Sequence, residues 1–223
     1  MKTINLLPLL ASILLIVMFS GCGQTKSKAN KDTGEAIEAT EPDTDGKDKP
    51  FGVKSGIIEY THSGDKTGTS IQYFDDYGMK TAVYSETVAG GDETKDWVVS
   101  IGEDQYMWDP SRGDQGMKTK NPMLKNMVET SGKDMLAYIV SMYEQMGMTK
   151  SSKETFLGKD CDVYKGPLGK VLVWKGIMMK MEMNMGTMVS RQEATSIKTN
   201  ISVDGKYFRI PENITFSEIQ GFN

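Results

Sequence analysis

The chain has 223 residues, and its 26 Lys and Arg against 30 Asp and Glu give a formal net charge of −4 at pH 7. Such a mildly acidic protein offers no basic surface to a phosphate backbone, so we expect no nucleic-acid partner. The sequence has a single histidine, His62, and contains no G-x-S-x-G, H-E-x-x-H or phosphate-loop motif. Acid–base chemistry would therefore fall to carboxylates or lysine, and we expect a protein that is not an enzyme and carries no cofactor.

The N-terminus has the features of an export signal. A short positive start precedes an apolar run from Leu6 to Phe19, which is shorter than a typical membrane-spanning helix. We predict a signal peptide over residues 1–21. The sequence Phe19-Ser20-Gly21-Cys22 resembles the bacterial lipobox, which implies that Cys22 is lipidated and anchors the chain to a membrane of the cell envelope. If the host has two membranes, the Gly23 that follows favours the outer one, with the protein facing the periplasm.

Residues 22–50 have the composition of a tether. After Cys22 they are rich in Lys, Asp, Glu, Thr, Gly and Pro, with Ile37 as the single large aliphatic residue. This segment buries too little apolar surface to offset its ordering entropy, so we expect it to be disordered. As a flexible coil it would span about 30 Å. With Cys22 acylated, Cys161 has no partner for a disulfide, and we expect it to be a small buried apolar residue.

Residues 51–223 are expected to form one domain of strands and helices. Short alternating segments between Gly, Asp and Asn turns predict five successive strands, over residues 56–61, 69–74, 79–87, 96–101 and 105–108. Helical spacing from Asn121-Pro122 then predicts two short helices, one over Pro122–Val128 and a second that ends near Met146. Strands return over residues 155–165, 171–174, 179–185, 188–203 and 214–219. This order of elements predicts an α+β fold.

The stretch around residue 180 alternates strictly between methionine and polar residues. The methionines are Met179, Met181, Met183 and Met185. A period of two places four thioethers on one face of a strand, which predicts an antiparallel sheet with one buried face.

The segment from Gly158 to Phe216 resembles the LolA-like half-barrel family of bacterial carrier and lipid-binding proteins. A strand that ends at Trp174 is followed by the turn Gly176-Ile177-Met178-Met179-Lys180, in which Met178 replaces the family's usual Pro. A glycine turn at Gly186 and the motif Phe208-Arg209-Ile210-Pro211 follow. The resemblance implies a strongly curved antiparallel sheet (a half-barrel) covered by the two short helices, with lipid or a partner segment on its concave side.

We therefore expect a monomeric, membrane-anchored protein that binds a lipid or an acylated protein on a concave apolar surface. Its lining is predicted to consist of the four methionines and four aromatic residues: Met179, Met181, Met183, Met185, Trp174, Tyr73, Trp97 and Trp108. A fully packed core without a cavity is the alternative for the methionine face.

Two other functions remain open. A protein-binding or envelope-sensing module would need the same apolar groove as a lipid carrier. A Met-rich protein could also hold Cu(I), because thioethers are soft ligands. However, thioethers two residues apart on a strand stand about 6.5 Å apart at their roots, and His62 is distant in sequence.

Overall fold

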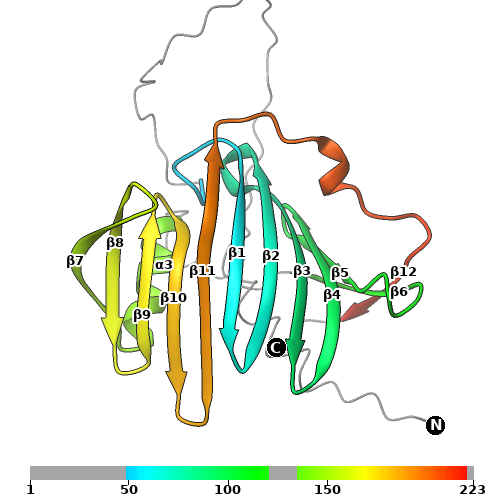
Figure 1. Ribbon diagram of the computed structural model, residues 1–223. Helices are drawn as coiled ribbons and strands as arrows, with labels where there is room; N and C mark the ends of the chain where they lie inside the picture. The colour runs from blue at the N-terminus through cyan, green and yellow to red at the C-terminus, as the bar shows by residue number, and fades with distance from the viewer. Residues whose placement is uncertain (1–48, 121–134, 220–223) are drawn as a thin grey trace, which may run out of the picture.

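The computed structural model describes residues 49–120 and 135–219, and its strands form one 12-stranded sheet (Figure 1). The strand order is β12-β6-β5-β4-β3-β2-β1-β11-β10-β9-β8-β7. Each neighbouring pair is antiparallel except β12 and β6, which run parallel. In the first half of the chain the strands are β1 Gly56–Gly64, β2 Lys66–Asp75, β3 Lys80–Ala89, β4 Asp92–Ile101, β5 Asp104–Trp108 and β6 Gln115–Lys120. In the second half they are β7 Thr149–Phe156, β8 Lys159–Gly166, β9 Gly169–Trp174, β10 Ile177–Met185, β11 Met188–Thr199 and β12 Thr215–Ile219.

The prediction of an α+β half-barrel covered by two helices is wrong. The described residues contain one α-helix, α3 (Met135–Gln145), and two short 3-10 helices, η3 (Asp76–Gly78) and η4 (Gly205–Phe208). The sheet is open and the protein is mainly β. The helix predicted over Pro122–Val128 lies outside the described residues, as do Cys22 and most of the predicted tether.

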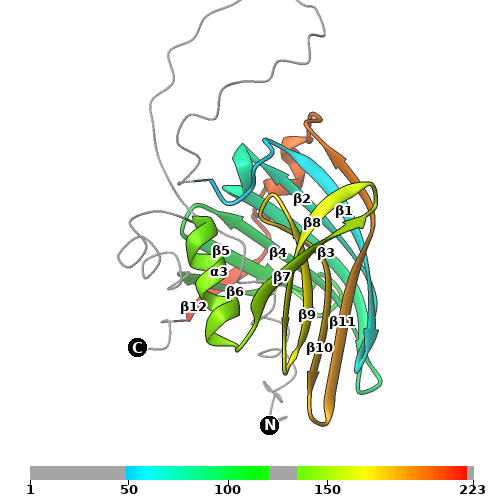
Figure 2. The ribbon, with the colours of Figure 1, turned by 90° about the vertical axis from the view of Figure 1, so that its left-hand side faces the viewer.

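Pairing across the sheet separates its residues into two faces. Tyr60 on β1 is paired with Ser70 on β2 and with Ala194 on β11, so these three side chains share a face. The same face of β10 carries Met181 and Met183, which are paired with Gln192 and Ser190. We call it the inner face, because α3 lies against it (Figure 2).

Helix α3 covers the β8–β10 part of the inner face. Its residues Ile139 and Tyr143 pack against Val171, Met181 and Met183 in one buried cluster. The apolar spacing that predicted this helix therefore corresponds to its contact with the sheet.

The C-terminal strap, residues 200–214, covers the outer face of β2–β5. It carries η4, from which Phe208 packs against Ala82, Val99 and Trp108. The ring of Tyr207 stacks on that of Tyr73 with centroids 3.8 Å apart. Tyr73, Trp97 and Trp108 of the opening meander therefore pack within the protein, beneath this strap.

A β-bulge interrupts the methionine strand. Met178 is paired with Val173 but Lys180 with Leu172, so Met179 is an extra residue. The bulge lies at the start of the predicted alternation, and from Lys180 onward β10 pairs with β11 without a shift in register. Met178 packs in the same cluster as Met181 and Met183, whereas Met179 packs in a different one, with Leu172.

Tyr60 stabilises the bulge from two strands away. Its hydroxyl donates a hydrogen bond of 2.9 Å to the backbone carbonyl of Met178. The ring reaches β10 across β11, where its paired residue is the small Ala194. A buried carbonyl displaced from the ladder by a bulge would otherwise lack a partner.

Candidate ligand-binding cavity

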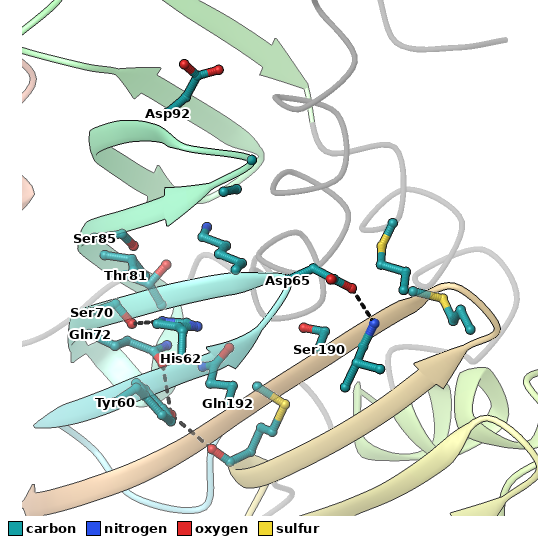
Figure 3. A pocket seen from close by; sticks show the side chains of 18 of the residues that line it. Tyr60, His62, Asp65, Ser70, Gln72, Thr81, Ser85, Asp92, Ser190 and Gln192 are labelled. Carbon is teal, nitrogen blue, oxygen red and sulfur yellow. Dashed lines mark hydrogen bonds between the residues drawn. The ribbon is translucent and has the colours of Figure 1, made fainter.

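A cavity of about 480 Å³ lies on the inner face of β1, β2, β3, β10 and β11 (Figure 3). Its lining combines apolar, neutral polar and charged side chains: Phe51, Tyr60, His62, Asp65, Lys66, Ser70, Gln72, Thr81, Val83, Ser85, Ala89, Gly90, Asp92, Met178, Met185, Met188, Val189, Ser190 and Gln192.

One end of the cavity is apolar and closed by the N-terminal strap, residues 50–55. Phe51 is 1% exposed, and its ring meets that of Phe74 edge to face with centroids 5.0 Å apart. The Phe51 and Gly52 amides donate to the carbonyls of Tyr77 and Lys175, each at 2.9 Å. The side chains of Tyr60 and Met178 complete this end.

Glycine at position 176 is required by the close approach of the N-terminal strap. Its φ is +78°, and a Cβ there would lie 2.1 Å from the carbonyl oxygen of Pro50. The turn at Lys175-Gly176 joins β9 to β10, and the absence of a side chain at Gly176 lets the strap pack against this turn.

A wall of neutral polar side chains runs along the middle of the cavity. Ser70, Thr81 and Ser85 are buried on β2 and β3, and Gln72 lies beside them (Figure 3). His62 Nε2 shares a hydrogen bond of 2.8 Å with Ser70 Oγ. Burial, reinforced by the charge of Lys66, lowers the pKa of His62 to about 4, so the imidazole is neutral at neutral pH.

The other end of the cavity is a mouth at the hairpin turns. The β1–β2, β3–β4 and β10–β11 turns lie at the same end of the sheet (Figure 1). Met185 and Met188 line the cavity there and are 47% and 41% exposed. The Asp65 carboxylate accepts a hydrogen bond from the Val189 amide, and the Asp65 amide donates to the Val189 carbonyl at 2.8 Å. These two bonds hold the β1–β2 and β10–β11 hairpins together.

Lys66 is the cation of the cavity lining. Burial lowers the pKa of Lys66, and the carboxylate of Asp96, which is paired with Ser85 on the inner face, partly offsets this effect. Burial in turn raises the pKa of Asp96. The two charges therefore face the same region of the inner face as His62.

The structure does not bring the predicted lining residues together. Met185 belongs to the cavity, whereas Met181 and Met183 pack beneath α3, and Met179 lies in another buried cluster. Trp174 packs at the edge of that other cluster, with the Lys159 ammonium 4.7 Å from its ring centroid. The remaining three residues, Tyr73, Trp97 and Trp108, lie on the outer face beneath the C-terminal strap.

Sequence reasoning missed the polar wall. Its members share one face of three neighbouring strands, with His62 on β1, Ser70 and Gln72 two positions apart on β2, and Thr81 and Ser85 on β3. The sequence does place these polar side chains at every second position of a strand, but Ser and Gln in such a pattern usually face solvent. A search restricted to apolar faces could not find this wall.

The Ser70–His62 pair has the distance of a nucleophile and its base but not the environment. An activating base needs a pKa near the working pH and a third group that orients it. Burial lowers the pKa of His62 to about 4, and within residues 49–120 and 135–219 no hydrogen bond joins its ring to a carboxylate. The pair therefore lacks both features of an activated nucleophile, and it offers a hydrogen-bonding surface to the cavity.

The described part of the chain contains no group of three or more His, Cys, Asp or Glu side chains that could hold a metal ion. It contains no helix long and apolar enough to cross a membrane. Cys161 is buried with a free thiol, as predicted.

No protein-family model and no curated protein matches the sequence. An uncharacterized conserved protein from Thermus thermophilus has a similar structure, with a TM-score of 0.52 and 6% identity over 78% of this chain and 95% of that one. The structural neighbours also include MucB, in the Pseudomonas aeruginosa MucA/MucB complex, with a TM-score of 0.43 and 8% identity over 74% of this chain and 58% of that one. A putative outer membrane lipoprotein-sorting protein domain from Vibrio parahaemolyticus has a TM-score of 0.31 and 11% identity over 70% of this chain and 89% of that one. The first likeness shows a shared fold, and the other two are too distant to add to the argument.

Proposed function

We propose that this protein is a non-catalytic, lipid-anchored binding protein of the cell envelope whose inner-face cavity holds a lipid or the acyl group of a protein. The observation that carries the proposal is the cavity of about 480 Å³, which has an apolar closed end and an exposed methionine mouth. Binding sites for small molecules have volumes of about 300–1,000 Å³ and are mostly apolar with a few placed polar groups.

A hollow of this size is not a packing defect. Protein interiors are packed as densely as organic crystals and contain few voids larger than a water molecule. The apolar tail of a ligand fits against Phe51, Tyr60 and Met178, where no water would be bound strongly. Its polar group then meets Ser70, Gln72 and His62, which offer neutral donors and acceptors.

The methionines support this proposal better than a Cu(I) site. His62 is paired with Gln192, which lies four positions along β11 from Met188, and this separation is about 13 Å at the usual rise of a strand. The imidazole and the mouth thioethers therefore do not converge on one ion. Flexible, polarisable methionine is instead suited to apolar guests of varied shape.

A matched pair of tryptophan substitutions on β3 tests the cavity. Val83 lines it, whereas Val88 lies on the outer face and is 37% exposed. Val83→Trp should fill the cavity and weaken binding of the fluorescent probe N-phenylnaphthylamine at least about tenfold, equivalent to 1.4 kcal/mol. Val88→Trp should leave the affinity unchanged. Equal affinities in both variants, or a probe that does not bind the unmodified chain, would contradict the proposal.

Anchoring through Cys22 is tested separately. The lipobox-like sequence motivates the expectation that Cys22→Ala either moves the full-length chain out of the detergent phase in Triton X-114 partitioning or leaves it uncleaved. Ser20→Ala, which keeps a small residue before the cysteine, is the control and should remain in the detergent phase. Normal processing and membrane fractionation of Cys22→Ala would refute the anchor without bearing on the cavity.

A further inference from the structure

The two methionines at the mouth differ from every other methionine whose burial the structure describes. Met185 and Met188 are 47% and 41% exposed, whereas Met178 and Met183 on the same hairpin are each 8% exposed. The remaining described methionines are buried or half-buried. Exposure therefore divides the thioethers of β10 and β11 into an accessible pair and a protected set.

The accessible pair is also organised. Met185 and Met188 are directly opposite each other at the end of the β10–β11 hairpin, which places their Cβ atoms about 5 Å apart. Both line the cavity, and the bonds between Asp65 and Val189 fix the hairpin that carries them. A change in their chemistry would thus alter the entrance and leave the buried clusters intact.

We propose that Met185 and Met188 form an oxidation site whose conversion to methionine sulfoxide weakens ligand binding, an inference that rests on the proposed function of the cavity. The oxidant is a peroxide. A sulfur lone pair attacks one peroxide oxygen, an S–O bond forms and the O–O bond breaks. The leaving hydroxide takes up the proton of the hydroxyl group now bound to sulfur and departs as water. Sulfur loses two electrons, the peroxide gains them, and reduction of the sulfoxide by a thiol-dependent reductase restores the thioether.

The direction of the effect follows from solvation. A thioether at the mouth loses little when an apolar ligand covers it, because its sulfur is a weak hydrogen-bond acceptor. A sulfoxide oxygen is polar and hydrated, and covering it without a new hydrogen bond is costly. Oxidation of the pair should therefore lower the affinity for an apolar ligand about tenfold, which corresponds to 1.4 kcal/mol.

The experiment uses the full-length chain with Cys22→Ala, which removes the predicted acylation site, and N-phenylnaphthylamine as the probe. Cavity binding is defined as the fluorescence component that Val83→Trp abolishes. The chain is titrated with hydrogen peroxide, each sulfoxide is located by peptide mass spectrometry, and the probe affinity is measured at each step. The affinity of every variant before peroxide treatment is its own reference.

Three variants isolate the pair. Met185→Leu combined with Met188→Leu conserves volume but removes both sulfurs, and its affinity should not respond to peroxide. Met79→Leu alters a half-buried methionine at the β2–β3 turn that does not line the cavity, and it should respond like the parent chain. Met185→Gln combined with Met188→Gln imitates the polar product and should bind weakly before any oxidation.

The outcomes separate this inference from the proposed function. Preferential oxidation of residues 185 and 188, with a loss of affinity that the leucine pair abolishes, supports the inference. It is overturned if other described methionines are oxidised first, if full oxidation of the pair leaves the affinity unchanged, or if the leucine pair still loses affinity. If the parent chain shows no probe binding sensitive to Val83→Trp, the proposed function fails and the control of binding fails with it. Peptide mapping still decides whether the pair is the preferred oxidation site.

Discussion

At the scale of single residues, the cavity depends on polar side chains that stay uncharged. His62 was identified in the sequence only as the sole histidine, and nothing in its neighbours indicated burial. The structure places its ring beside Ser70 and Lys66, with Asp96 across the inner face. These contacts join residues of β1, β2 and β4, so the state of His62 is a tertiary property that composition and spacing could not predict.

The low pKa of His62 has a consequence for stability. In the unfolded chain the imidazole titrates near 6.5 and in the folded protein near 4, so the unfolded state binds the proton more readily between these values. The free energy of unfolding should therefore fall as the pH drops from about 6.5 to about 4. His62→Gln removes the contribution of the imidazole to this pH dependence, whereas the carboxylates still titrate.

Urea denaturation at about pH 7 and about pH 4.5 measures the effect. The difference in unfolding free energy between the two pH values should be smaller in His62→Gln than in the parent chain. Ser63→Ala, at the neighbouring position of β1 whose side chain points to the opposite face, should retain the parent difference. Identical pH dependence in His62→Gln and the parent would show that the imidazole is not buried in its neutral form.

At the scale of elements, local turn chemistry was predictable and strand register was not. Glycine and aspartate turns marked the ends of β2 through β5, and the glycine turn predicted at Gly186 is confirmed. The sequence did not indicate the bulge at Met179, because the consecutive apolar residues there suit a strand with or without an extra residue. The segment predicted as one strand over 155–165 is a hairpin that turns at Leu157-Gly158, where both residues have positive φ. Leucine at such a position disguises a turn.

Two methionines on the same face of β10 should respond differently to the same substitution. Met183 is 8% exposed beneath α3, so Met183→Lys should bury a charge and cost about 3 kcal/mol or more of unfolding free energy. Met185 lies two residues further along at the mouth, where a lysine can extend into water, so Met185→Lys should change stability by less than about 0.5 kcal/mol. Urea denaturation of both variants provides the measurement. An equally large loss of unfolding free energy in both variants would mean that the mouth is closed. No loss in either variant would mean that α3 does not pack on this face.

At the scale of the whole molecule, the two faces of one sheet serve different purposes. The inner face carries the cavity and α3, and the outer face of β2–β5 is sealed by the C-terminal strap. The sequence indicated the aromatic residues but not which face they occupy, because their partners in the strap are about 100 residues away. The sequence analysis also missed β6, which pairs in parallel with β12 although the two strands are about 100 residues apart in the chain. Because β6 and the β7–β8 hairpin were not predicted, the expected share of strand was too low and the fold was assigned to the α+β class.

This division of faces makes a prediction for Trp108. It packs on the outer face against Phe216, with ring centroids 6.0 Å apart, so Trp108→Phe should lower the unfolding free energy by about 1–2 kcal/mol. The same variant should bind N-phenylnaphthylamine as the parent chain does, because the residue lies outside the cavity. Fluorescence titration and urea denaturation of one preparation give both values. A loss of affinity as large as that of Val83→Trp would place Trp108 in the binding site.

The most direct test of the cavity as a ligand site is photocrosslinking in the native envelope. A diazirine amino acid is placed at Ser190, which lines the cavity, or at Arg191, the next residue of β11, whose exposed side chain points to the other face. After irradiation of cells that express the full-length chain, mass spectrometry of the purified protein identifies covalent adducts. We expect a lipid or acyl-group adduct at position 190 and none at position 191. No adduct at position 190, or the same adduct at both positions, would contradict this expectation.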